Sequence, residues 1–99
     1  MREDTKGLLQ LVQHRQTESV QELLRKGYSP NVVGEFDYTP AYIAAKKNDF
    51  EMLKILAAGG ADLSAADAAG LTPHFWAKEN ENQAMADFIT SNIEAKRMR

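Results

Sequence analysis

A period of 33 residues runs through the chain and restricts the possible folds more than any other feature of the sequence. Thr39-Pro40 recurs as Thr72-Pro73, and Gly27 recurs as Gly60 at the same offset. A unit of this length is too short to be an independent domain, and it must bury its apolar face against a neighbouring copy. The 99 residues accommodate three such units in one domain, with boundaries predicted at about 6–38, 39–71 and 72–92, followed by a helical or frayed basic tail over 93–99.

Local signals predict the same helical content in each unit. Thr39 and Thr72 can cap a helix through their hydroxyl groups, and the prolines that follow them suit its first turn. In the middle unit, Asn48-Asp49 ends this short helix and can cap the next one. Apolar residues recur at helical spacing over 50–58, and Gly59-Gly60 then ends that second helix. The pattern predicts an all-α repeat protein whose helix pairs alternate with long turns.

Three stretches of the chain match one family pattern. Residues 67–73 give Asp-x-x-Gly-x-Thr-Pro, residues 39–45 give the small-residue first helix, and residues 59–63 give the exit Gly-Gly-Ala-Asp-Leu. With this spacing the chain resembles an ankyrin-repeat protein over about residues 6–92. The resemblance implies an α-solenoid of helix-turn-helix units joined by short β-hairpin-like loops.

Departures from the family pattern concern the loops and the two ends. Tyr42 and Phe75 replace the usual histidine, so the hydrogen bond that it gives between adjacent loops is in question, and we expect both rings to pack between loops. Ile93 occupies the place of the glycine stop, which allows the last helix to continue through Lys96. Before the first unit, Asp4 or Thr5 is available as a helix cap. Polar substitutions in the third unit fit a terminal repeat, and we expect an array closed at both ends.

The composition and the motifs of the chain argue against catalytic, metal-binding and cofactor sites. The chain has no cysteine, and its two histidines, His14 and His74, show no metal-ligand spacing. We expect no catalytic residue, no metal and no cofactor. Twelve basic and 14 acidic residues give a net charge of −2, so we expect neither nucleic acid nor a membrane as partner. The absence of cysteine favours a reducing intracellular location, cytoplasmic or alternatively nuclear.

The resemblance implies that a partner binds at the loop tips and on the concave face made by the first helices. The matching tip positions are Val33, Glu35, Phe36, Tyr38 and Leu71, and the matching first-helix positions are Lys46, Lys47 and Glu79. Phe36 and Tyr38 are the strongest candidates, because large aromatic residues on exposed turns often anchor interfaces. Two alternatives stay open: Phe36 could pack over the neighbouring loop, and the two lysines could simply be solvated.

The sequence therefore predicts a non-enzymatic protein–protein interaction module or adaptor that binds a protein or peptide. One alternative is a regulatory or targeting ankyrin domain of a larger enzyme or channel. We expect a monomer, and the other alternative is an array that associates with itself through the end that carries Phe75 and Trp76.

Overall fold

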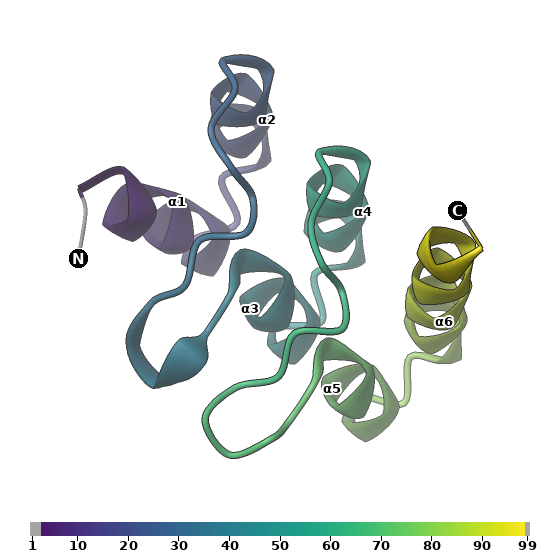
Figure 1. Cartoon of the computed structure of the whole chain (residues 1–99). Coiled ribbons are helices and arrows are strands. Elements are labelled where there is room, and N and C mark those ends of the chain that lie inside the picture. The colour runs from purple at the N-terminus through teal and green to yellow at the C-terminus, as the bar shows by residue number, and fades with distance from the viewer. Residues whose placement is uncertain (1–2, 99) are drawn as a thin grey trace.

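The computed structural model describes residues 3–98, and side chains from Gly7 onward, as a stack of three helix pairs (Figure 1). In this range no strand forms, and no helix is long and apolar enough to cross a membrane. The first helices of the pairs form one layer and the second helices form another, which confirms the all-α repeat fold. In chain order the helices are α1 (Glu3–Gln13), α2 (Thr17–Arg25), α3 (Pro40–Lys46), α4 (Phe50–Ala58), α5 (Pro73–Glu79) and α6 (Gln83–Arg97).

The helices begin and end where the sequence predicts in the second and third units. Thr39 and Thr72 each accept a hydrogen bond from the backbone amide three residues later, at 3.1 and 3.2 Å. Asp49 caps α4 in the same way at 3.2 Å. Gly60 adopts a left-handed conformation (φ 98°) after α4, as Gly27 does after α2 (φ 94°).

The core lies between the two layers and along both contacts between neighbouring units. The helix α3 is buried at every position from Pro40 to Ala45, because α1 and α5 cover it on opposite sides. The small side chains of Ala41, Ala44 and Ala45 allow this close approach. A Cβ atom on Gly59 would lie 2.9 Å from Cδ1 of Leu24, so glycine also permits close contact between α2 and the end of α4. The largest fully buried side chains are Tyr42, Leu8, Met52, Leu53, Leu56, Leu63, Met85 and Ile89.

Polar side chains link each unit to the next at the helix ends. The Asn31 side chain donates to the Gly60 carbonyl at 3.1 Å and accepts from the Asp62 amide at 2.7 Å. At the next junction, the Asn80 side chain donates to the Ala45 carbonyl at 3.1 Å, and Asn82 donates to Asn48 at 2.9 Å. These bonds satisfy polar groups that the helix ends leave without partners, so they fix the register between units.

At the two ends of the array, one sequence prediction is confirmed and the other is wrong. As expected from the missing glycine, α6 continues to Arg97, and Lys96 donates to the Ala61 carbonyl at 2.7 Å. The helix α1 begins at Glu3, so Asp4 and Thr5 lie inside it. The prediction that one of them precedes and caps the helix is therefore wrong.

A tyrosine replaces the family histidine as the link between α3 and the following loop. The Tyr42 hydroxyl donates to the Asp67 carboxylate at 2.7 Å, and Asp67 also accepts from the Ala69 and Leu71 amides. Burial raises the pKa of Tyr42 to about 12, and the hydrogen bond to Asp67 adds to the rise. The same bond is the main reason that the pKa of Asp67 is lowered. Tyr42 therefore holds the second loop, as the histidine would.

Leu56→Ala tests the packing of the central unit. Leu56 is fully buried between neighbouring helices, so truncation leaves a cavity, and we expect the free energy of unfolding to fall by about 2–5 kcal/mol. Urea denaturation followed by circular dichroism measures this loss. The control Leu56→Met keeps most of the volume and should cost less than about 1.5 kcal/mol. Equal, small losses for both variants would contradict this placement of Leu56.

Tyr42→Phe tests the link to the second loop, because it removes only the hydroxyl group. At neutral pH we expect a smaller loss of stability than for Leu56→Ala. Because Asp67 has a lower pKa in the folded protein, its contribution is complete above its unfolded pKa and disappears as pH falls through the folded value. The difference in urea denaturation between the wild type and the variant should therefore shrink as the pH is lowered below the unfolded pKa of Asp67, about 3.9. An undiminished difference there would show that the carboxylate is not responsible.

Candidate functional site

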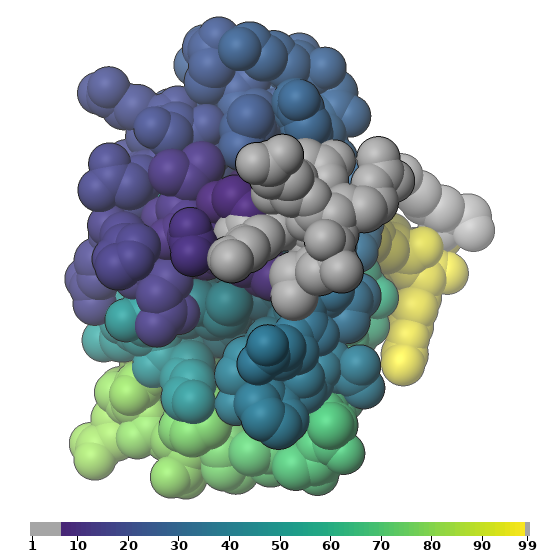
Figure 2. Space-filling model, turned by 90° about the vertical axis from the view of Figure 1, so that its left-hand side faces the viewer, coloured from purple at the N-terminus to yellow at the C-terminus, as the bar shows by residue number. Residues whose placement is uncertain are grey.

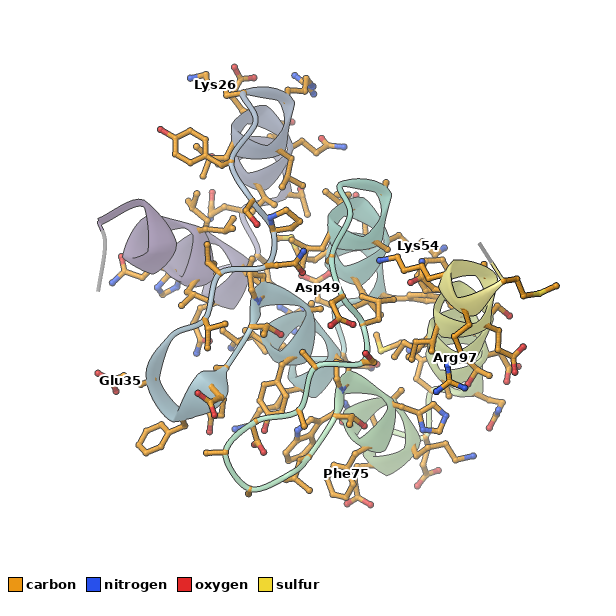
Figure 3. All side chains as sticks on the ribbon, in the orientation of Figure 1. Lys26, Glu35, Asp49, Lys54, Phe75 and Arg97 are labelled. Carbon is orange, nitrogen blue, oxygen red and sulfur yellow. The ribbon has the colours of Figure 1, made fainter. Side chains whose placement is uncertain are left out.

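The tip of the first loop is a tight, left-handed turn. The Tyr38 amide donates to the Glu35 carbonyl at 3.1 Å, and Phe36 and Asp37 between them have φ values of 57° and 61°. Such turns favour asparagine and glycine, because a Cβ atom is strained in the left-handed region. This chain has a phenylalanine and an aspartate there instead. Figure 3 shows Glu35 pointing outward from the same tip.

Neighbouring backbone groups hold this tip in place. The Gly34 amide donates to the Tyr38 carbonyl at 2.9 Å and closes the base of the turn. The Phe36 carbonyl accepts from the Ala68 amide of the second loop at 2.8 Å, so adjacent tips are joined. The Phe36 ring centroid lies 5.8 Å from that of Tyr38, yet 67% of the residue remains exposed. Most of the Phe36 side chain is therefore not packed over the neighbouring loop.

A groove of about 520 Å³ opens beside this tip, between the loop, α1 and α3. Phe36, Tyr38 and Glu35 line one side of it. Its other walls come from Leu9, Gln10, Gln13 and Ile43. Apolar side chains with a few amide and carboxylate groups at the edge are the usual composition of a site that takes an apolar anchor.

Aromatic rings continue from the groove toward α5 around the Lys46 side chain. Tyr38 stacks on Tyr42 with 4.8 Å between ring centroids. The Lys46 ammonium lies 5.4 Å from the Tyr38 centroid and 5.3 Å from that of Trp76. Both distances are within the range of cation–π attraction, so the two rings orient the ammonium. Lys46 is thus a positioned cation beside the groove, although its residue remains exposed.

Phe75 does not behave as predicted. Whereas Tyr42 is buried and packs below the loops, Phe75 is 38% exposed and contacts Trp76 edge-on with 5.1 Å between centroids. Figure 3 shows its ring projecting from α5 at the end of the array. No loop among the described residues covers it, so the prediction that Phe75 packs between loops is wrong.

The remaining candidates do not join the groove. Val33 is exposed but is not one of the residues that line it. Leu71 is half-buried against the core. Lys47 and Glu79 lie at the C-terminal ends of α3 and α5, and the Lys47 carbonyl accepts a hydrogen bond from Arg15 at 2.9 Å. The predicted set therefore divides into Glu35, Phe36, Tyr38 and Lys46 around one groove and four residues elsewhere.

Sequence reasoning missed the contribution of α1 to the groove. The period itself contains the signal: Gln13, Lys46 and Glu79 are 33 residues apart, and Leu9 corresponds to Tyr42. The predicted first-helix positions came only from the second and third units, so the prediction did not include α1. The helix α1 supplies the wall opposite Phe36 because α1 and α3 are adjacent first helices.

The charged and histidine side chains do not assemble a reactive centre. Over residues 7–98, no three His, Asp or Glu side chains come close enough to hold a metal ion. His14 follows α1 and His74 lies in α5, in the first and third units. The geometry of the described residues is that of a binding surface, with an exposed aromatic residue, an apolar groove and an oriented cation.

Comparison with known proteins identifies the family. A family model for ankyrin repeats in three copies matches residues 8–98. An ankyrin repeat-containing protein of Schizosaccharomyces pombe is 35% identical to the chain over an alignment of 82 residues that covers 77% of this chain and 40% of that protein. The chain thus spans less than half the length of this relative. Ankyrin repeats are generally protein–protein interaction modules, and with three copies over almost its whole length this chain belongs to the ankyrin-repeat family.

Proposed function

We propose that this chain is an adaptor module that binds a protein or peptide segment in the groove between α1, α3 and the first loop, with Phe36 as the main anchor. The observation that carries the proposal is the conformation of the tip. A left-handed backbone holds an aromatic residue that is 67% exposed, and no burial within the chain compensates for the strain. Strained backbone that presents an exposed side chain is typical of functional positions.

The rigidity of the tip favours tight binding. Hydrogen bonds from Ala68 and to Glu35 fix the turn, so its backbone loses little freedom when a partner binds. An aromatic residue that becomes buried at an interface is often a hot spot. The groove beside Phe36 can receive an apolar side chain of the partner, between Leu9 and Tyr38.

Lys46 defines the polar preference of the proposed site. Two aromatic rings hold its ammonium, which has no acceptor among the described hydrogen bonds. We therefore propose that the partner segment places a carboxylate or a backbone carbonyl near Lys46 and an apolar residue in the groove. We also propose an intracellular, cytoplasmic location, which the absence of cysteine supports.

Two glycine substitutions separate the binding role of the tip from its role in folding. Phe36→Gly and Asp37→Gly each relieve one left-handed residue, so we expect unchanged stability or a gain of up to about 1 kcal/mol in urea denaturation. Only Phe36→Gly removes the proposed anchor. We expect it to weaken partner binding at least about tenfold, while Asp37→Gly retains binding.

The first measurement is affinity capture from a cell lysate with wild type, Phe36→Gly and Asp37→Gly as baits, followed by mass spectrometry and by titration of each purified partner. Proteins held by wild type and Asp37→Gly but lost from Phe36→Gly would support the proposed site. Equal retention by all three baits would contradict it. Capture of no partner by wild type would contradict an independent adaptor and favour the regulatory domain of a larger protein.

A further inference from the structure

Trp76 brings the third unit next to the proposed site. It lies one period after Ile43 and two periods after Gln10, and both of these residues line the groove beside Phe36. The helices α3 and α5 pack against each other, so this row of first-helix positions continues from the groove onto the third unit. Figure 2 shows the first loop, in blue and teal, directly above the third unit, in green, on one face of the molecule.

Neighbouring aromatic rings hold the Trp76 ring in place. Its centroid lies 6.3 Å from that of Tyr42 and 5.1 Å from that of Phe75, and both pairs meet edge-on. Edge-to-face contacts of this kind stabilise an aromatic pair beyond the burial of its surface. Trp76 is half-buried and its indole nitrogen is buried, so the accessible part of the ring is hydrocarbon. The ring is therefore a fixed apolar surface.

The Lys46 side chain lies between the groove and the third unit. Its ammonium is 5.4 Å from the centroid of Tyr38, which lines the groove, and 5.3 Å from that of Trp76, which does not. A lysine ammonium is carried on a flexible stem, so a single ring leaves it several positions. Attraction to two rings restricts it to the space between them. None of the ion pairs among the described residues includes Lys46, so its charge stays available.

The Asp67 carboxylate is close enough to sense this charge. The pKa of Asp67 is lowered mainly by the hydrogen bond from Tyr42, and the positive charge of Lys46 contributes a smaller part. Asp67 already accepts from the Tyr42 hydroxyl and from the Leu71 and Ala69 amides, at 2.7, 2.9 and 2.9 Å. These bonds use most of its acceptor sites, so the Lys46 ammonium keeps its donors for a partner.

We infer that Trp76 is a positioning residue of the proposed site: it holds the Lys46 ammonium beside the groove, where the ammonium pairs with an Asp or Glu side chain of the partner. This role rests on the proposed function and narrows the partner to an acidic segment that also carries an apolar anchor. A carboxylate gains the attraction of a full opposite charge at Lys46, which a backbone carbonyl does not. The third unit thus belongs to the site, although none of its residues lines the groove.

The first test needs no partner and uses nuclear magnetic resonance of the full chain. Protons that lie over the face of an aromatic ring resonate upfield, so the ε-methylene protons of Lys46 report on both rings. We expect upfield signals in the wild type and a return toward ordinary lysine values in Trp76→Leu. Phe75→Leu removes a ring that is not one of the two near the ammonium, and it should leave the signals nearly unchanged. Ordinary lysine signals in the wild type would overturn the positioning role.

The second test uses a display library of short random peptides, selected on the wild type for binders that Phe36→Gly does not retain. Each Asp or Glu of a selected peptide is then replaced by Asn or Gln, and both versions are titrated. We expect a replacement that weakens binding to the wild type at least about fivefold but has no effect with Lys46→Met. Trp76→Leu should lose most of this preference for the acidic version, whereas Trp76→Phe, which retains a ring, should keep part of it.

Lys78→Met is the matched control for charge, because Lys78 is another exposed lysine and its ammonium donates to Gln83 at 3.0 Å. It should retain the preference, and circular dichroism would establish that all variants are folded. A purely structural role of Trp76 would weaken both peptide versions equally, and that result, or a preference that survives in Trp76→Leu, would overturn the inference. Absence of any peptide that depends on Phe36 would overturn the proposed function and the acidic partner with it, whereas the Lys46 signals test the positioning separately.

Discussion

The contact between neighbouring helix pairs is the interaction on which the rest of this structure depends. No pair can bury its apolar face alone, so α3 and α4 become the centre of the core only because units lie on both sides of them. The small side chains of Ala41, Ala44 and Ala45 and the glycine at position 59 bring the helices close enough for this packing. With only two such contacts, loss of packing at Leu56 affects the whole domain.

Hydrogen bonds between the packed units fix the arrangement of the loops. Asn31, Asn80 and Asn82 connect helix ends across the junctions, and Tyr42 holds Asp67 of the second loop. In the second loop, the Ala68 amide donates a hydrogen bond to the Phe36 carbonyl. A chain of contacts therefore runs from the buried face of α3 to the exposed tip, and it explains how a strained turn stays ordered without burial of its aromatic side chain.

Much of the fold follows from recurring sequence signals, and the errors occur where the recurrence stops. Thr39, Thr72 and Asp49 cap helices because capping needs only a side-chain oxygen three residues before an amide. At the first unit, α1 begins before Asp4, and no cap motif indicates this. Phe75 is 38% exposed, because no loop among the described residues covers it. In the first unit, Leu11 and Leu23 are only partly buried, although they keep the apolar character of the fully buried residues one period later.

The period, the helix pairs, the family and the aromatic candidates Phe36 and Tyr38 follow from the amino-acid sequence, because each depends on residues close together in the chain or on a regular repeat. Which of the candidates share a site depends on the three-dimensional packing of the units. The Lys46 ammonium lies near two aromatic rings from different units. Leu9 and Gln13 of α1 line the same groove as Phe36 of the first loop. Lys47 follows Lys46 at the end of α3 but projects in a different direction, because neighbouring positions on a helix do not share a face. Such choices depend on how the units stack, and no local pattern contains that geometry.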